Sequence, residues 1–353
     1  MVALKGISPA DCFYPRITEW ENGNLLMVTL CGSGRKVFEL RDMEKPFTGA
    51  VGILSGVWAK SKSGVSWNGT LCVEALITAT VEGRKVMLYT HKASHPLEAS
   101  EPNALYLWVT DNNRTLHIGP VSEDSVVNKT LDSNLLYSDD ALHLLQAKGN
   151  EESSVMSLAR LTEELKTINF VLRTWTQLDA SSALSTPTAG LVGFLSNTSS
   201  GGNTWTDDYR CVNAIVTKAA KVKNVFKFTG PGSMATWPVN SREDNRQYGL
   251  VNHRFTLVAT VTIHQVAKGS TPLLGAGLDA PVSTNFIGLS YGMDKTWETV
   301  FDGKKTTSNT IWELGKEHQV ALMLQDGCKG SVYVNGKVVG SPETIRTLET
   351  QGT

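Results

Sequence analysis

The chain has 353 residues, 41% of them apolar and 19% charged, which is ordinary for folded domains and sufficient for two hydrophobic cores. Because 33 basic side chains nearly balance 34 acidic ones, the overall charge does not favour nucleic acid, an anionic membrane or another polyanion as a partner. No apolar run approaches the roughly 18 residues that span a bilayer, and the start of the chain, broken by Lys5, does not resemble a secretory signal.

Residues 17–147 repeat a pattern of strand, tight polar turn and strand. The segments are ITEW-ENG-NLLMVTL, GSG-RKVFELRDM, CVEALITATV-EG-RKVMLYTHK, ALYLWVTD-NNR-TLHIGPV and NLLYS-DDA-LHLLQA. Successive antiparallel hairpins at this spacing are typical of β-propeller blades. Alternation along the strands predicts one inward-facing set of side chains: Val86, Leu88, Tyr106, Trp108, Leu136, Leu142 and Leu144.

A propeller ring usually needs at least four blades of about 40 to 50 residues each. Residues 1–156 supply about three blades, so we interpret them as the C-terminal part of a propeller. Because an open ring would leave strand edges unpaired, we expect the chain to be a piece of a longer protein.

One amphipathic helix is predicted over residues 157–175, within a connector that extends to residue 178. Its apolar positions recur every three or four residues: Leu158, Leu161, Leu165, Ile168, Leu172 and Trp175. Its opposite side carries Glu163, Glu164, Lys166 and Arg173. We expect the apolar stripe to be buried between the β regions that precede and follow it.

Residues 179–353 indicate a second β domain after a link rich in Ser, Pro and Gly. Strands are predicted at residues 255–263, 272–278, 286–291, 318–324 and 331–340. The Asn335-Gly336 pair predicts a type I′ hairpin turn, which requires positive φ at both central residues. This pattern is similar to the jelly-roll sandwich of concanavalin A-like lectins and laminin G modules, here lacking its last strands.

Polar groups that suggest chemistry have simpler structural explanations. His91 and His95 have no third ligand nearby in the sequence, so loop positions are favoured over a metal site. The carboxylate pairs Asp139-Asp140 and Asp207-Asp208 occupy predicted turns. The tryptophans of the second domain are favoured as core residues, so no sugar site is assigned to them.

Cysteines and glycosylation motifs leave the cellular compartment open. The five cysteines lack a C-x-x-C pattern, and a buried thiol is favoured for each, with any disulfide pairing undecided: Cys12, Cys31, Cys72, Cys211 and Cys328. Four N-glycosylation sequons begin at Asn68, Asn113, Asn128 and Asn197.

Longer stretches are similar to the trypanosomal trans-sialidase and surface-glycoprotein superfamily. They include CFYPRITEWENGNLLM, LYLWVTDNNR, LLYSDDALHLL, PTAGLVGFLS and FTLVATVTIHQVAKGSTPLLGAGLD, and they follow one another over almost the whole chain. The resemblance implies an all-β protein with one long helix. Its parts would be a partial six-bladed sialidase propeller (residues 1–156), a connecting helix (157–178) and a concanavalin A-like sandwich (179–353).

Active members of that family cleave or transfer terminal sialic acid. The resemblance implies three arginines that bind the substrate carboxylate, a tyrosine nucleophile with an activating glutamate, and an acid/base aspartate from the preceding half of the propeller. Every position that matches within this chain differs. Tyr14 replaces the activating glutamate, Thr29 and Pro102 replace two arginines, Asp132 replaces the nucleophilic tyrosine, and Ala147 replaces a further glutamate.

These replacements predict a catalytically inactive homologue that uses no cofactor and no metal. The resemblance implies a cell-surface or secreted glycoprotein that adheres to host glycans or to extracellular-matrix or cell-surface proteins, held at a membrane only through an anchor outside this chain. Two alternatives stay open. One is an exo-α-sialidase or trans-sialidase that acts on terminal sialic acid, and the other is a truncated product without autonomous function.

Overall fold

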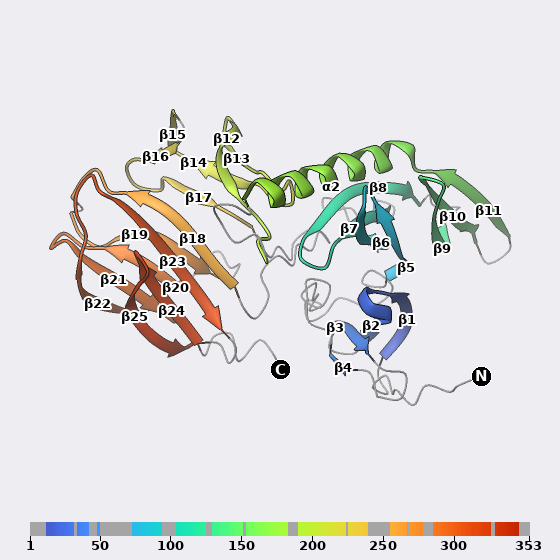
Figure 1. The fold of residues 1–353 in the computed structure, drawn as a ribbon, viewed down its shortest axis with the longest axis horizontal. Coiled ribbons are helices and arrows are strands. Elements are labelled where there is room, and N and C mark those ends of the chain that lie inside the picture. Colours follow the sequence, from blue (N-terminus) through green and yellow to red (C-terminus); the bar gives the residue numbers. More distant parts are fainter. Residues whose placement is uncertain are drawn as a thin grey trace. The chain divides into compact units, whose positions relative to one another are not determined.

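Strands dominate the protein, as the sequence predicts. The computed structural model describes residues 12–31, 34–41, 48–49, 73–93, 104–124, 129–150, 153–182, 190–223, 225–238, 255–266, 268–277, 285–325 and 329–345. These residues contain one α-helix, α2, and one 3-10 turn, η1 (Figure 1). Within them, no helix combines the length and the apolar character needed to cross a bilayer.

The chain divides into two compact units. Unit 1 comprises residues 1–250 and unit 2 comprises residues 251–353. The predicted second domain starts earlier, at residue 179, so its first strands group with the helix and the blades in unit 1.

Unit 1 starts with antiparallel sheets in which each strand pairs with its neighbour in the sequence. The first sheet contains β1 (Cys12–Glu19), β2 (Leu25–Cys31), β3 (Gly34–Leu40) and β4 (Thr48–Gly49), with η1 (Glu21–Gly23) between β1 and β2. The second sheet contains β5 (Val73–Val81), β6 (Arg84–Ala93), β7 (Ala104–Thr110) and β8 (Thr115–Glu123). The third sheet contains β9 (Lys129–Ser138), β10 (Ala141–Gly149) and β11 (Ser154–Arg160). This up-and-down order is that of propeller blades and confirms the predicted hairpins.

The sheet formed by β5 to β8 is buried on both faces. One face, with Val86 and Leu88, packs in the cluster that includes helix α2, and the other, with Tyr106 and Trp108, packs against the first sheet. The predicted inward set is therefore wrong in placing these four residues on one face. It is also wrong for Leu136, which is 59% exposed. Alternation cannot identify an inward face where both faces are apolar.

The connector helix begins later than predicted. The predicted range, 157–178, corresponds to α2 at Thr162–Ser182, and the residues just before it form β11. Leu158 lies in β11 and is 68% exposed, so its assignment to the apolar stripe is wrong. Backbone pairing with the edge of β10 outweighs the helical periodicity there. The strand ends where the Leu161 amide donates to the Leu142 carbonyl at 2.8 Å.

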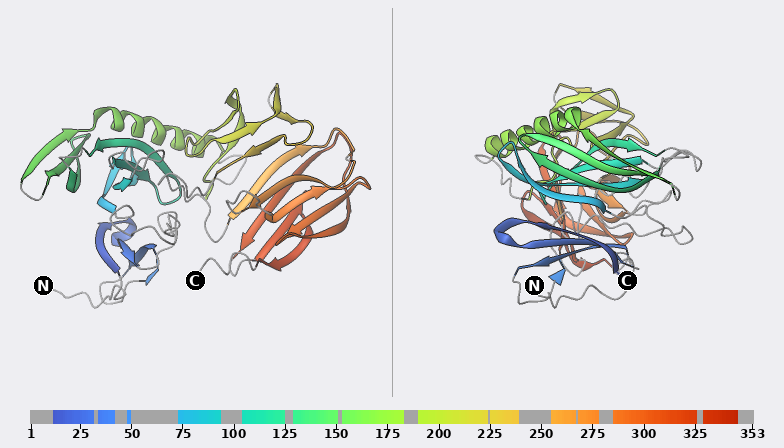
Figure 2. Two further views of the ribbon diagram at one scale, coloured as in Figure 1. Left: turned by 180° about the vertical axis from the view of Figure 1, so that it is seen from behind. Right: turned by 90° about the vertical axis from the view of Figure 1, so that its right-hand side faces the viewer.

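The rest of the apolar stripe of α2 is buried as predicted. Leu165, Ile168, Leu172 and Trp175 are at most 8% exposed and share one cluster with side chains of β5 to β10 and of residues 209–212. Both views in Figure 2 show α2 lying along the sheet formed by β5 to β8. The stripe thereby joins two blade-like sheets to the segment that follows the helix.

Short strands complete unit 1. One sheet contains β12 (Leu195–Gly201), β13 (Thr204–Asp207), β14 (Ala214–Thr217) and β17 (Met234–Thr236). A separate two-stranded hairpin contains β15 (Ala219–Val222) and β16 (Val225–Phe228).

Unit 2 contains two four-stranded antiparallel sheets with one shared core. The first contains β18 (Phe255–Thr262), β23 (Glu317–Gln325), β24 (Lys329–Val334) and β25 (Lys337–Thr344). The second contains β19 (Thr271–Gly277), β20 (Asn285–Tyr291), β21 (Thr296–Phe301) and β22 (Lys304–Ile311). Side chains of both sheets form the core, in which Trp297 and Trp312 are almost completely buried.

Two hairpin turns of unit 2 have the same backbone signature. Asn335 and Gly336 have φ values of 49° and 76°, which confirms the predicted type I′ turn. Asp302 and Gly303, with φ values of 47° and 78°, connect β21 to β22 in the same way. These two strands were not predicted from the sequence, although an Asp-Gly pair is a recognised signal for such a turn.

A disulfide closes the first hairpin of unit 1. Cys12 and Cys31 are bonded to each other and lie opposite one another in the register of β1 and β2. The prediction of buried thiols is therefore wrong for both, because the hairpin brings together residues that are distant in the sequence. Cys211 is a buried free thiol, as predicted. Cys72 and Cys328 lie outside the described residues.

Candidate functional site

Tyr14 and Thr29, two of the five predicted degenerate positions, lie on β1 and β2. Tyr14 sits at a β-bulge between Phe13 and Arg16, with φ of 55°, and it is 64% exposed. Thr29 is buried, and its Oγ1 donates to the Phe13 carbonyl at 2.7 Å. The hydroxyl of Thr29 thus stabilises the bulge, and neither Tyr14 nor Thr29 supplies a carboxylate or a cation.

Asp132 and Ala147, two further degenerate positions, lie opposite each other on β9 and β10. Their pairing falls at a register shift directly after Ala147. The Asp132 side chain is 61% exposed, and Ala147 offers no polar side-chain group. The hairpin therefore places Asp132 beside Ala147, and the exposed carboxylate of Asp132 is the one polar side-chain group of this pair. Pro102, the fifth position, lies outside the described residues.

Asp132 belongs to a group of four charged side chains that come from three sheets. We call Arg16, Glu74, Lys92 and Asp132 the Arg16 cluster. Arg16 donates from Nε to the Glu74 carbonyl at 2.6 Å, and its Nη2 lies 3.6 Å from Asp132 Oδ1. Lys92 Nζ lies 3.7 Å from Glu74 Oε1 and donates to the Thr130 carbonyl. Two cations and two anions thus form a neutral cluster.

Within the Arg16 cluster, each charge is balanced by a neighbouring charge of opposite sign. Burial raises the pKa of Glu74 above its ordinary value, while the neighbouring charges of Lys92 and Arg16 oppose that rise. The Nε and Nη2 groups of Arg16 form one edge of its guanidinium, and both are already engaged. That edge is therefore not open for the bidentate binding of an external carboxylate.

Buried hydroxyls accompany the cluster between β6 and β9. Thr90 Oγ1 lies 3.4 Å from Ser133 Oγ and accepts a hydrogen bond from the Ala75 amide. Thr130 donates from its amide and its hydroxyl to Asp124 at 2.8 and 2.7 Å. These groups satisfy one another, so they hold the strands together rather than face a substrate.

A metal site finds no support in the part of the chain that the structure describes. His91 is buried in β6, with its ring 5.5 Å from that of Trp108, so it is a core residue and not the loop residue predicted. His95 lies outside the described residues. No group of three His, Cys, Asp or Glu side chains among the described residues is placed to hold a metal ion.

Two of the four predicted glycosylation sites, Asn113 and Asn197, lie among the described residues. Asn113 is exposed in the turn between β7 and β8, where its amide donates to Asp111 Oδ1 at 3.0 Å. The backbone of Asn197 lies in β12. Asn68 and Asn128 lie outside the described residues.

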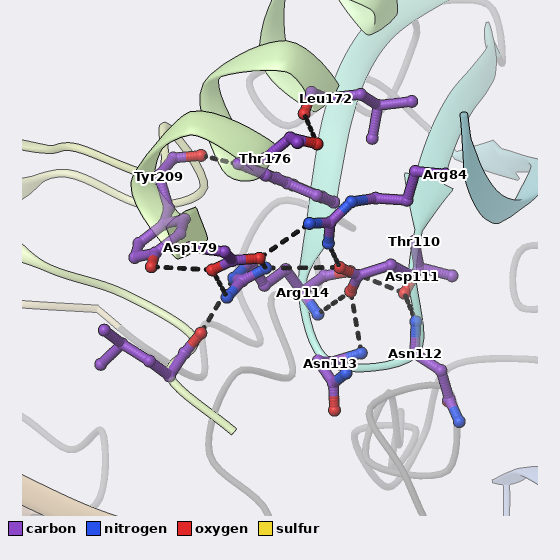
Figure 3. A network of polar contacts seen from close by, with 12 residues as sticks. Arg84, Thr110, Asp111, Asn112, Asn113, Arg114, Leu172, Thr176, Asp179 and Tyr209 are labelled. Carbon is purple, nitrogen blue, oxygen red and sulfur yellow. Dashed lines mark hydrogen bonds and ion pairs between the residues drawn. The ribbon is translucent and has the colours of Figure 1, made fainter. Parts of the chain in front are cut away.

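A second charged network, which the sequence analysis missed, joins the blade region to the segment after the helix. Asp179 of α2 accepts hydrogen bonds from Arg84 at 2.7 Å, from Arg114 at 2.8 Å and from the Tyr209 hydroxyl at 3.1 Å (Figure 3). Asp111 accepts from Arg84 at 2.6 Å. Burial alone would raise the pKa of Asp179, but the bonds from the two arginines outweigh it and lower that pKa. Burial also raises the pKa of Tyr209 to about 12, which keeps its hydroxyl a donor.

Asp207 organises the loop that carries Tyr209. Its carboxylate accepts hydrogen bonds from the backbone amides of four residues: Phe194, Tyr209, Cys211 and Val212. Burial raises the pKa of Asp207, and these four amides oppose the rise. Asp207 is the last residue of β13, so the predicted turn begins one residue later, at Asp208, and the Asp207 carboxylate holds that turn together. Asp139 and Asp140 likewise form a turn, with φ values of 50° and 52°.

Unit 2 has a shallow hollow of about 220 Å³ on the sheet formed by β19 to β22. Ser270, Leu274, Ser290, Val300 and Lys305 are among its lining residues. None of the residues that line it is aromatic, so it lacks the ring on which a sugar would stack.

Comparisons with known proteins agree with the sequence resemblance. A family model described as "Trans-sialidase, C-terminal domain" matches residues 187–353, and one described as "BNR repeat-like domain" matches residues 2–159. Sialidase 85-1.1 of Trypanosoma cruzi is 50% identical over 98% of this chain and 46% of its own length. Sialidase 85-1.3 of the same organism is 46% identical over 39% of this chain and 80% of its own length.

Solved structures are similar over nearly the whole chain. The structure of Trypanosoma rangeli sialidase has a TM-score of 0.84 and 37% identity, and the match covers 97% of this chain and 56% of that one. The same sialidase in complex with sialic acid also matches with a TM-score of 0.84. The chain spans 46% and 30% of the length of the first two curated relatives, and about half of the matched structures.

Proposed function

The chain belongs to the trans-sialidase and sialidase-like family, with a sialidase-type β-propeller region, one helix and a lectin-like domain. From this premise, we propose that it is a non-catalytic member that binds host glycans or proteins. The observation that carries the proposal is the neutral Arg16 cluster. Sialic acid is an anion, and its recognition requires cations that are not already neutralised. In the Arg16 cluster both cations have acidic partners.

The chemistry at the matching positions supports the same proposal. A nucleophile needs an adjacent base within hydrogen-bond reach. Asp132 faces Ala147, which cannot act as a base, and Tyr14 replaces a carboxylate. The Thr29 hydroxyl donates to a backbone carbonyl and stabilises the bulge.

We place the protein at a cell surface or among secreted glycoproteins, with host glycans or extracellular-matrix and cell-surface proteins as partners. The sequons at Asn68, Asn113, Asn128 and Asn197 support this location. Binding of the chain to a glycan array and to immobilised matrix proteins tests it. A failure to bind any member of either set would argue against adhesion, although it would leave the lack of catalysis standing.

Sialidase or trans-sialidase activity is the second candidate, because the relatives carry the name sialidase and one matched structure holds sialic acid. Hydrolysis of a fluorogenic sialoside, measured for this chain and for the longest natural polypeptide that contains it, decides between the two. We expect no turnover above a buffer blank, with T. rangeli sialidase as the positive control. Turnover that Asp132→Ala or Tyr14→Phe abolishes would overturn the non-catalytic proposal.

A further inference from the structure

A two-stranded hairpin in unit 1 carries a local excess of positive charge. It comprises Lys218, β15, Lys223 and β16, and we call it the basic hairpin. In Figure 1 it projects from the sheet that contains β14 and β17. Lys218, Lys223 and Lys227 are all exposed. The basic hairpin is thus a raised feature of unit 1 and not part of its core.

The balanced charge of the whole chain hides this excess. Between Asp208 and Glu243 the sequence contains no acidic residue. The same stretch contains six basic residues: Arg210, Lys218, Lys221, Lys223, Lys227 and Arg242. The low net charge of the chain therefore does not exclude a local site for an anionic surface.

One face of the basic hairpin is anchored and the other is not. Phe226 packs its ring 4.9 Å from that of Trp205 on β13, and Lys221 lies opposite Phe226 in the register. The next cross-strand pair toward the turn, Val222 and Val225, points to the opposite face. These valines are 44% and 61% exposed. The face opposite to the anchored one thus presents an exposed apolar pair, next to the turn.

An exposed apolar pair beside lysines is chemically specific. A soluble polyanion such as a sulfated polysaccharide would use the lysines but not the valines. The interface of an anionic bilayer uses both, because apolar side chains enter the acyl boundary while lysines remain at the level of the headgroups.

We propose that the basic hairpin docks on the surface of an anionic lipid bilayer. Val222 and Val225 enter the interface, and Lys218, Lys223 and Lys227 contact the headgroup phosphates. This function is independent of the adhesive function proposed above, and it needs neither the Arg16 cluster nor unit 2.

Cosedimentation of the full chain with vesicles tests this inference. We use phosphatidylcholine vesicles with and without 30% phosphatidylserine. The wild type is expected to bind only the anionic vesicles, and less at high salt. The triple variant Lys218→Gln, Lys223→Gln, Lys227→Gln should lose on the order of 100-fold in affinity, at about five-fold per lysine. The matched control Lys304→Gln, Lys329→Gln, Lys337→Gln removes three exposed lysines of unit 2 and should bind as the wild type does.

The valines distinguish a bilayer from a soluble polyanion. Val222→Ser with Val225→Ser should weaken vesicle binding by roughly ten-fold while leaving retention on a heparin column unchanged. If the serine variants unfold, Val225→Trp provides a separate measurement, since its fluorescence should be quenched by brominated lipids in anionic vesicles. The proposal would be overturned if the wild type did not bind anionic vesicles, or if the triple variant at Lys218, Lys223 and Lys227 lost no more affinity than the unit 2 lysine control. It would also be overturned if the chain were retained on heparin while the tryptophan at position 225 was not quenched.

Discussion

Asp179 shows how a single carboxylate can hold three segments of the chain together. It lies near the end of α2 and accepts hydrogen bonds from Arg84, Arg114 and Tyr209. Its side chain is 26% exposed, so the ion pairs are partly screened by solvent. Arg114 also packs over the ring of Trp175, 5.7 Å from its centroid. The network therefore links the charged and the apolar contacts of the helix.

Replacing Asp179 by Asn should lower the free energy of unfolding at neutral pH by about 2 kcal/mol, because two arginines lose their charged acceptor. The folded-state pKa of Asp179 is lowered, so its contribution is complete above the ordinary pKa of about 3.9 and is lost as the pH falls through the folded value. The deficit of the variant should therefore stay constant from pH 8 to 5 in urea titrations and shrink only in more acidic solution.

A matched control for this measurement is Asp139→Asn, which changes an exposed carboxylate in a turn whose positive φ suits asparagine. Its effect should stay within about 0.5 kcal/mol. A deficit of Asp179→Asn that shrinks between pH 8 and 5, or one no larger than that of the control, would contradict the role given to Asp179.

Asn113, a sequon asparagine, is exposed in the turn between β7 and β8. When the chain is expressed through a eukaryotic secretory pathway, we expect a glycan at this position, since the turn presents the side chain to solvent. Intact-protein mass spectrometry of Asn113→Gln should show the loss of one glycan. An unmodified Asn113 in a sample whose other sequons are occupied would refute this expectation.

At the residue scale, the sequence indicates the positions of residues better than it indicates their contacts. It placed Tyr14, Thr29, Asp132 and Ala147 from the resemblance, and the structure puts each in a defined strand. The pairing of Arg16 with Asp132 was not predicted, because it depends on how separate sheets meet. No local pattern in a sequence encodes such a meeting.

Helix α2 is the element whose burial matters most to unit 1. Ile168 is fully buried in the cluster shared by two sheets and the segment 209–212, and Trp175 donates from Nε1 to the Tyr209 carbonyl at 2.7 Å. A buried face of this kind, rather than helix propensity, supplies most of the stability of a helix in a folded protein.

Ile168→Arg should destabilise unit 1 by about 4 kcal/mol, because it places an unpaired charge in an apolar cluster. The matched control is Thr167→Arg, which puts the same side chain on the exposed side of α2. It should change stability by no more than about 0.5 kcal/mol. Chemical denaturation followed by circular dichroism measures both. Equal stability of the two variants would show that the stripe is not buried as described.

At the element scale, the sequence predicted periodicity well and boundaries less well. The stripe from Leu165 to Trp175 is confirmed, but Leu158 continues the same spacing into β11. Residues 154–160 form a strand because they pair with the edge of β10. The presence of that edge depends on the fold and not on the sequence of the segment itself. The strands on either side of Asp302-Gly303 show the reverse case, since a local turn signal was present and was not used.

On the scale of the whole molecule, the two units are consistent with the family that the resemblance indicated. Successive blade-like sheets, one helix and a domain of two packed sheets follow the same order as the matched sialidase structures. The blade-like hairpins and the class of the second domain were predictable, because repeat length and turn spacing are local properties. The burial of both faces of the β5 to β8 sheet was not, because it depends on neighbouring sheets.

On the function proposed above, this member of the family does not bind sialic acid through its Arg16 cluster, since the cations there are already paired. Saturation-transfer NMR of the chain with 3′-sialyllactose, and with lactose as the control, tests it most directly. We predict equal and negligible transfer to both sugars, and no change in Arg16→Gln. Transfer to the sialic acid protons that is absent for lactose and is abolished by Arg16→Gln would show that the Arg16 cluster does bind sialic acid.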